Sequence, residues 1–492
     1  MLLCLLTSAT AFAQFSGKGT GDKASPYQVT TAAQLDELRN CLKEETYVKL
    51  MNDIDLTDYI AKKYAKVGWE PINCTDYDFW GDDYTYWCEV YFDGNGKTIS
   101  GLTINRDEVE ASMGLFGVFI GEIKNLTVEC NIYVDTNGSM SWVGIGALCG
   151  YNWGGRFYNC EVSGSIYSPA PQLGGLCGIS DNGYFESCSL KANAIVDGGY
   201  YYHVGGICGD SRGGTFKKCY NYGTVKGADE IVGGIVGRGS GTLVENCHSL
   251  GTVNANMGIV GGIAGSFSGG EIKNCSSSGS ISTKYTSAGG IVGTSYYWLG
   301  TYQDDSYSDD DGGIISNCSS TATISAFSNV GGILGESHDE SFIVDRCRFY
   351  GIVKMKDLDG YDEDELDWMD LEAFGGIAGT MYGTISNCMT YQSNSNSISG
   401  RNKVGGIVGY LRGSLVNSYA YGYVNGDKYV GGLCGYVEGD KDHRASIQSS
   451  CNYNRLVEVN TRDGEIGRIV GHVGSYCDIP SISAAKSNRS DI

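Results

Sequence analysis

The chain has 492 residues, of which 74 are glycine, 5 are proline and 19 are cysteine, and its formal net charge is −22. The scarcity of proline excludes a collagen-like chain, and a hydrophobic fraction of 41% excludes a disordered low-complexity chain. The acidic balance argues against nucleic-acid binding because it repels phosphate backbones, and no apolar run is long enough to span a membrane.

The N-terminal residues 1–13 have the pattern of a signal peptide. Residues 2–12 form a short apolar run, and Ala11-Phe12-Ala13 fits the small-x-small pattern of a cleavage site. We expect cleavage before Gln14, and therefore a protein that is secreted or held at the outer cell surface. The alternative interpretation of this run is a buried N-terminal strand.

Residues 14–105 are expected to form an N-terminal cap and lead-in strands. Within them, residues 31–42 place Leu35, Leu38 and Leu42 on one helical face, with Thr31 in position to serve as N-cap. We expect this amphipathic helix to cover the N-terminal end of a repeat array, because open strand edges invite aggregation.

Residues 106–476 repeat a pair of short motifs. Gly233-Gly-Ile-Val-Gly237 recurs at Gly261 and Gly289, a spacing of 28 residues, and an apolar-x-Asn-Cys motif follows 13 or 14 residues later in most copies. Such a unit, with two or three short β-prone runs, cannot bury its own apolar face, whereas stacked units can. The pattern predicts an all-β chain, a right-handed parallel β-helix (solenoid) of about 11–12 coils. At ~4.8 Å per coil the rod would be about 55 Å long.

Two repeat positions take most of the cysteines. One follows Gly-Gly-Ile and also accepts Val, Ala and Leu, which indicates a small apolar slot. The other follows the asparagine, whose stacked amides can hydrogen-bond from coil to coil. Its members are Cys160, Cys188, Cys219, Cys247, Cys275, Cys318, Cys347, Cys388 and Cys451. Because Leu126 and Ser418 fill the same slot in two copies, we interpret this main cysteine column as packed, reduced thiols; disulfides between neighbouring coils are the alternative.

Two inserts interrupt the repeats, at residues 295–312 and 354–373, and are expected to leave the rod at different corners of adjacent coils. Their aromatic rings could stack on sugar rings while neighbouring carboxylates accept hydroxyl hydrogen bonds. The candidate ligand-binding residues are Tyr296, Tyr297, Trp298, Tyr302, Tyr307 and Trp368. A partial oxygen-ligand pattern for calcium, the one cofactor that the sequence suggests, consists of Asp357, Asp359, Asp362 and Glu365. The alternative for both inserts is a solvated acidic loop.

The repeats resemble the GLUG motif, named for Gly-Leu-x-Gly, which stands here as Gly114-Leu-Phe-Gly117 and Gly175-Leu-Cys-Gly178. The resemblance covers residues 106–471. It implies an exported bacterial surface or secreted protein, similar to those of Bacteroidota and to the repeats in the non-catalytic region of IgA-specific metallopeptidases. The sequence contains no His-Glu-x-x-His motif, so protease activity does not carry over.

Together these features predict an adhesin-like binding protein that presents loops on a β-solenoid to host or environmental glycans or proteins. We expect a monomer with no nucleic-acid partner. We predict no enzymatic activity, because the five histidines are widely spread and carry no triad or metal-ligand spacing. The alternatives are a polysaccharide lyase or glycoside hydrolase on a β-helix, and a purely structural spacer. Residues 477–492 are expected to form a polar C-terminal tail.

Overall fold

The computed structural model describes residues 15–75, 88–107, 109, 111–135, 143–169, 172–199, 203–229, 231–295, 312–356, 373–393, 397–461 and 464–478. The expected signal peptide, residues 1–13, lies outside them. Within this part of the chain, no helix is long and apolar enough to cross a membrane.

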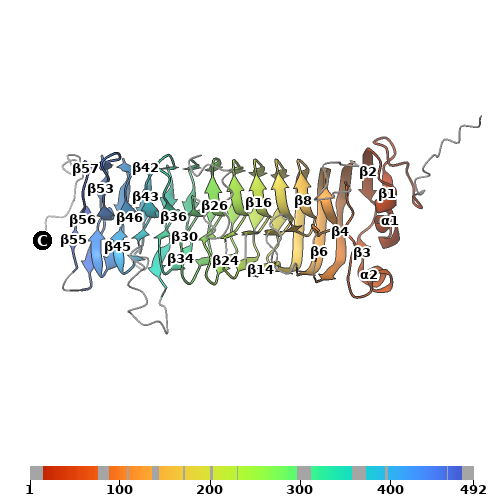
Figure 1. Ribbon diagram of the computed structural model, residues 1–492, viewed down its shortest axis with the longest axis horizontal. Helices are drawn as coiled ribbons and strands as arrows, with labels where there is room; N and C mark the ends of the chain where they lie inside the picture. Colours follow the sequence, from red (N-terminus) through yellow and green to blue (C-terminus); the bar gives the residue numbers. More distant parts are fainter. Residues whose placement is uncertain are drawn as a thin grey trace, which may run out of the picture.

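The described residues form a rod of stacked coils, with the N-terminal helices at one end and β55–β57 (Ile466–Gly467, Val470–Val473 and Cys477–Asp478) at the other (Figure 1). Strands of successive coils pair in parallel into an 11-stranded, a 12-stranded and a 34-stranded sheet. The predicted parallel β-solenoid is therefore confirmed. The 12-stranded sheet contains β5 (Phe116–Phe119), β8 (Cys149–Trp153), β11 (Cys177–Asp181), β16 (Cys208–Arg212), β21 (Val236–Ser240), β26 (Ala264–Ser268), β31 (Val292–Thr294), β36 (Leu334–Ser337), β41 (Ala378–Met381), β46 (Val408–Leu411), β51 (Cys434–Val437) and β56.

The 11-stranded sheet precedes the 12-stranded sheet in each coil. Its strands are β7 (Gly144–Ile145), β10 (Gln172–Gly174), β15 (His203–Gly205), β20 (Ile231–Gly233), β25 (Val260–Gly261), β30 (Ala288–Gly289), β35 (Val330–Gly331), β40 (Phe374–Gly375), β45 (Asn402–Gly405), β50 (Lys428–Gly431) and β55. The tight turn that joins the two sheets is the Gly-Gly-Ile motif.

One coil holds five short strands rather than the two or three that the sequence predicts. The coil of β20 and β21 continues through three strands of the 34-stranded sheet: β22 (Leu243–Glu245), β23 (His248–Ser249) and β24 (Thr252–Ala255). The breaks between these strands are two residues long, at 246–247 and 250–251. The first begins with Asn246, whose φ of +54° is left-handed. Left-handed backbone ends a strand locally and turns the chain.

The repeated asparagines occupy this left-handed position in every coil where they occur. Asn274 has φ +55° and Asn317 φ +52°, and Ser187 (φ +58°) and Lys218 (φ +50°) adopt the same conformation where asparagine is absent. Asparagine is favoured there because it tolerates this conformation better than most residues. The predicted amide contacts between coils are also present: Asn317 Nδ2 donates to Asn274 Oδ1 at 2.6 Å.

Glycine is required at the Gly-Gly-Ile turn because the backbone comes too close for a side chain. A Cβ on Gly233 would lie 1.8 Å from the carbonyl oxygen of Val236 in the same coil. A Cβ on Gly234 would lie 2.1 Å from the carbonyl oxygen of Gly262 in the next coil. Both distances are far below van der Waals contact, so the glycine columns follow from steric exclusion.

The main cysteine column carries hydrogen bonds as well as packing. The backbone N–H of Cys219 donates to Sγ of Cys247, and that of Cys247 to Sγ of Cys275, each at 3.3 Å. The Cys247 thiol donates in turn to the carbonyl oxygen of Phe216 at 3.5 Å. Every cysteine in the described part of the chain is a free thiol. The thiol therefore fills the interior and accepts the N–H that follows each left-handed turn.

We expect Cys275→Ala to lower the free energy of unfolding by about 1–3 kcal/mol, because it leaves the buried N–H of Cys247 without an acceptor. Cys275→Ser should cost less. Ser418 already occupies this slot in another coil, where its Oγ accepts the N–H of Cys388 at 3.1 Å. Denaturant unfolding followed by circular dichroism measures both. Equal losses for the two variants would mean that the column contributes volume alone.

The structure corrects one member of this column. Cys451 was assigned to it from the sequence, but Cys451 pairs in register with Tyr419, which faces outward and is half-buried. Ser450 takes the column position, where its Oγ accepts the N–H of Ser418 at 3.0 Å. The reason is the preceding residue: Ser449 holds the left-handed turn with φ +50° and so fixes the register.

The N-terminal end is covered by two short helices, α1 (Ala32–Glu37) and α2 (Thr57–Lys63), with the 3-10 turn η1 (Leu38–Asn40) after α1 (Figure 1). Thr31 caps α1 as expected, because its Oγ1 accepts the Gln34 N–H at 3.3 Å. The α-helix is shorter than the expected 31–42 because the chain tightens into η1 after Glu37.

A buried carboxylate, Asp36, ties this cap together and is 1% exposed. It accepts hydrogen bonds from the side chains of Arg39, Tyr59, Lys63 and Tyr64. Burial acts to raise the pKa of Asp36, but these donors outweigh it and lower the pKa to about 2. The residue therefore joins η1 and α2 to α1 with a fixed negative charge.

Candidate functional site

The residues predicted to bind ligand or calcium all fall on segments outside the described residues, namely 296–311 and 357–372. These are Tyr296, Tyr297, Trp298, Tyr302, Tyr307, Trp368, Asp357, Asp359, Asp362 and Glu365. The flanking strands nevertheless place both inserts. The first lies between β31 and β32 (Ile314–Ser316), and the second between β39 (Ile352–Met355) and β40. They thus leave the rod at different corners of adjacent coils, as expected.

The first insert departs from the corner where the 12-stranded sheet ends and the 34-stranded sheet begins. In an ordinary coil this corner is a two-residue turn, such as residues 241–242 between β21 and β22. Among the described strands that precede β56, only three of these connections are longer than two residues. They are residues 295–313, 338–342 and 438–444. The three longest connections at this corner therefore belong to the C-terminal half of the rod.

These connections and their neighbours form a surface that we call the corner patch. Its members are His338, Glu340, Tyr382, Arg412, Asp440 and His443. They follow β36, β41, β46 and β51, which are four consecutive strands of the 12-stranded sheet. The base of the first insert adjoins it, because Ser295 Oγ donates to Ser337 Oγ at 2.8 Å.

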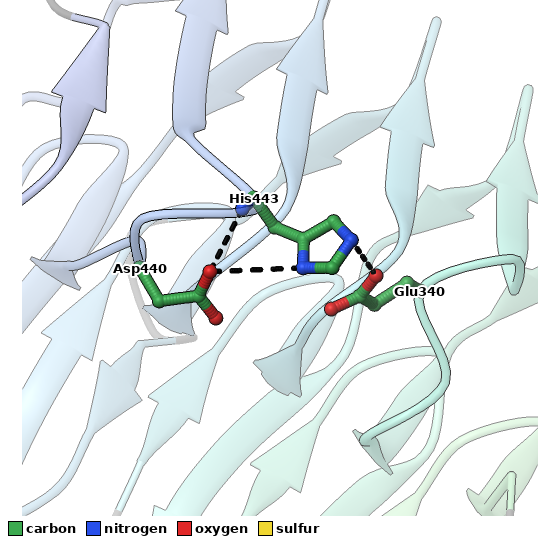
Figure 2. Close-up of side chains that lie close together, drawn as sticks. All are labelled: Glu340, Asp440 and His443. Atoms are coloured by element: carbon green, nitrogen blue, oxygen red, sulfur yellow. Dashed lines mark hydrogen bonds and ion pairs between the residues drawn. The ribbon is translucent and has the colours of Figure 1, made fainter.

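His443 lies between two carboxylates that come from coils three strands apart (Figure 2). Its Nε2 is 2.8 Å from Glu340 Oε2, and its Nδ1 is 3.7 Å from Asp440 Oδ1. All three side chains retain solvent access, with 56%, 46% and 32% of their surface exposed for His443, Glu340 and Asp440. The group is therefore a polar surface that bridges several coils.

Asp440 accepts more of the hydrogen bonds found in the corner patch than its other acid, Glu340. Its Oδ1 accepts the backbone N–H groups of Asp442 and His443, each at 2.8 Å. Its Oδ2 accepts from Arg412 Nη2 at 2.6 Å. The two backbone hydrogen bonds, followed by that of Arg412, lower the pKa of Asp440 to about 2. This carboxylate stays ionised at any physiological pH.

Aromatic rings lie beside these charges. The His338 ring stacks on Tyr382 with centroids 4.7 Å apart, and the Arg412 guanidinium carbon lies 5.0 Å from the Tyr382 ring centroid. Tyr382 in turn meets Tyr410 edge to face at 6.3 Å. The corner patch thus combines planar rings with donors and acceptors of both signs, which is the composition of sites that bind polar ligands such as sugars.

Glu340, Asp440 and His443 could each offer one atom to a cation, because these atoms lie within 4.8 Å of one another. Their arrangement fits a metal poorly. The two ring nitrogens of His443 face different carboxylates, and Arg412 already neutralises Asp440. A bound cation would have to displace the Glu340–His443 contact and tolerate the guanidinium. We therefore treat the cluster as a hydrogen-bonding surface.

The corner patch was missed at the sequence level, although a signal for it exists. In an ordinary coil the column residue follows the first glycine of the Gly-Gly-Ile motif by 14 residues (247 − 233 = 14). In the coils with the longer connections 338–342 and 438–444 the spacing is 16 residues (347 − 331 = 16) and 19 residues (450 − 431 = 19). These excesses are small beside the two inserts.

Comparisons with known proteins find similarity over part of the chain only. No protein-family model matches the chain. A protein of Evansella cellulosilytica named "Putative Gly-rich membrane protein" is 41% identical over 143 residues, which are 28% of this chain and 15% of that protein. A solved chain from Bacteroides ovatus, described as a "putative immunoglobulin A1 protease", is 22% identical with a TM-score of 0.36, covering 75% of this chain and 86% of that chain. Neither likeness assigns the chain to a family.

Proposed function

We propose that this chain is an exported, adhesin-like binding protein that uses the corner patch and the first insert to hold a glycan or protein ligand. The observation that carries the proposal is the placement of the longer connections. Residues 295–313, 338–342 and 438–444 all leave the same corner of the rod. Loops on a rigid scaffold are the usual location of binding residues, and lengthened loops at one corner of a solenoid form a continuous face.

The chemistry of this face supports a polar ligand. The first insert contains Tyr296, Tyr297 and Trp298, and the corner patch contains Tyr382 and Arg412. Rings of this kind pack against the apolar face of a sugar, while carboxylates and a guanidinium satisfy its hydroxyls. The resemblance to GLUG-repeat proteins and the expected signal peptide support an exported location, from which such a ligand would be met.

We infer binding rather than catalysis. A lyase or hydrolase of this fold needs a carboxylate pair, or a base with a cation, aimed at one bond. In the described corner patch, Asp440 and Glu340 are instead engaged by Arg412 and His443. Calcium remains part of the proposal only for the second insert, through Asp357 and Asp359.

The test is a glycan array and a protein pull-down with a loop-replacement variant. Replacing residues 296–311 with a two-residue turn should abolish binding, because the turn found at 241–242 closes this corner without distorting the coil. Removal of residues 357–372, which leave a different corner, is the matched control and should preserve it. Each assay is run with calcium and with a chelator.

Point variants in the corner patch test this prediction at single residues. We expect Tyr382→Ala and Arg412→Gln each to weaken binding about tenfold, as loss of an aromatic or a charged contact usually does. Unchanged binding in the variant lacking 296–311 would refute the proposal and favour a structural spacer. Equal loss in both loop variants would point to general damage to the rod.

A further inference from the structure

A second surface lies on the 34-stranded sheet, away from the corner patch. It is formed by β43 (Met389–Tyr391), β48 (Tyr419–Tyr421), β53 (Cys451–Asn452) and the residue after β53. Met389, Tyr419 and Cys451 are in register, and Tyr391 pairs with Tyr421. We call this surface the tyrosine strip: Met389, Tyr391, Tyr419, Tyr421, Cys451 and Tyr453. The strip exists as a continuous row because Cys451 faces outward here rather than inward.

The tyrosines of the strip run along the rod from coil to coil. Tyr421 and Tyr453 stack nearly parallel, 13° apart with centroids at 4.8 Å. Tyr391 is tilted 47° from Tyr421 at 6.1 Å and is 49% exposed, so it does not lie flat on that neighbour. The strip therefore presents a tilted ring at Tyr391, followed by ring edges and phenol groups in the next two coils.

The six side chains of the strip carry no formal charge, although the whole chain carries −22. A polyanion would be repelled at long range by that net charge. A cation or a basic peptide would find no carboxylate within the strip. Uncharged ligands with hydroxyl groups have no such penalty, because the phenols can exchange hydrogen bonds with them and a ring can pack against their C–H faces.

We propose that the tyrosine strip binds an uncharged linear polysaccharide that lies along the rod axis. The strip repeats once per coil, at the ~4.8 Å spacing of parallel strands. This is close to the length of one sugar residue in an extended chain, so successive sugars can each meet one ring of the row Tyr391, Tyr421 and Tyr453. The inference goes beyond the binding role proposed above and concerns a different face, so each can fail without the other.

Cys451 supplies a direct probe. It and Cys477 are the half-buried cysteines of the described chain, whereas the others are buried. We expect galactomannan or xyloglucan at saturation to slow alkylation of Cys451 at least about fivefold, because the bound chain covers it. Cys477, on the last described coil, is the internal control and should react unchanged. Alkylation is read by peptide mass spectrometry.

Two results would overturn the proposal. Alkylation of Cys451 at the same rate with and without each neutral polysaccharide means that nothing covers the strip. Equal slowing of Cys451 and Cys477 means a bulk effect of the polymer. Polygalacturonate forms the charged arm, and stronger protection of Cys451 by it than by the neutral polymers would contradict the assignment of an uncharged ligand.

Substitutions test the same surface independently. Tyr391→Ala should weaken galactomannan binding about tenfold in affinity electrophoresis, and Tyr421→Ala should do the same by breaking the row. The matched control is Tyr167→Ala. Tyr167 is an exposed tyrosine that stacks on Tyr133 at 5.4 Å near the other end of the rod. Equal effects of Tyr391→Ala and Tyr167→Ala on galactomannan binding, or no effect of Tyr391→Ala, would refute the proposal that the tyrosine strip binds the polysaccharide. Removal of residues 296–311 should leave this binding intact.

Discussion

Gly261→Ala is expected to lower the free energy of unfolding by about 3–5 kcal/mol, a large loss for a change of one methyl group. A Cβ on Gly261 would lie 1.7 Å from the carbonyl oxygen of Ala264 and 2.7 Å from the backbone nitrogen of Gly293. Both obstacles are backbone atoms held by coil-to-coil hydrogen bonds, so neither can move aside alone. Thermal and denaturant unfolding followed by circular dichroism measure the loss.

The control for this prediction is Gly241→Ala. Gly241 has φ +58°, but a Cβ there would meet nothing closer than 3.9 Å. Its cost is therefore the left-handed conformation alone, about 1 kcal/mol. Limited proteolysis should cut Gly261→Ala near that coil first, because each coil of a solenoid contacts only its neighbours. Similar stability losses for the two variants would show that steric exclusion does not explain the glycine column.

The repeat made the architecture predictable, because each motif marks one physical event. Gly-Gly-Ile marks a close approach of two backbones, as at Gly233, and asparagine marks a left-handed residue, as at Asn246. The number of strands per coil was underestimated because a single left-handed residue divides what reads as one β-prone run. A composition of β-branched residues does not reveal such a break.

The assignment of Cys451 failed because residue identity was given more weight than backbone conformation. The last apolar-x-x-Ser copy ends at Ser450, one position before the cysteine. A hydroxyl can replace a thiol there because the slot needs a small acceptor for a backbone N–H, as Ser418 and Ser450 show. A list of cysteines does not show that the column accepts hydrogen bonds from the backbone. Leu126 stands at the same position in one coil and cannot accept such a bond, so it suggested that the column serves packing alone.

The candidate site was partly predictable. The position and composition of residues 295–312 indicated a working loop, and the structure shows which corner it leaves. The contact of Glu340 with His443 could not be predicted, because these residues are far apart in the sequence and meet through loops that cross intervening coils. Repeat spacing places a residue in a coil, but it does not say how far a loop reaches along the rod.

A further group of buried polar side chains lies where the 11-stranded and 12-stranded sheets meet. His203 on β15 is 1% exposed and Asp210 on β16 is fully buried. His203 Nδ1 donates to Gln172 Oε1 at 2.6 Å, while Asp210 Oδ2 accepts from Arg212 Nη2 at 3.0 Å. Burial lowers the pKa of His203 to about 3; Asp210 opposes this shift, and Arg238 and Arg212 reinforce it. The imidazole is therefore neutral in the folded protein.

This neutral histidine makes the rod sensitive to mild acid. The unfolded chain binds a proton at His203 below a pKa of about 6.5, whereas the folded chain does not until about pH 3. Stability should therefore fall as the pH drops through this window, by about 1.4 kcal/mol per pH unit, and the contribution of His203 should be fully present only above about pH 6.5. Between pH 6.5 and 4.5 the loss is about 2 kcal/mol, because the unfolded imidazole is already half protonated at pH 6.5; the pKa of Asp36 becomes relevant only at lower pH.

His203→Asn isolates this contribution, because its amide can still donate to Gln172 Oε1 but does not titrate. We expect the wild type to lose about 2 kcal/mol more than the variant between pH 6.5 and 4.5 in denaturant unfolding. At pH 7 the variant should be the less stable of the two, since its smaller side chain leaves part of this buried space unfilled. A histidine resonance that stays unshifted in NMR spectra down to pH 4 would identify the neutral ring directly. Parallel pH profiles for wild type and variant would show that the imidazole titrates normally, and that acid acts on the rod through other groups.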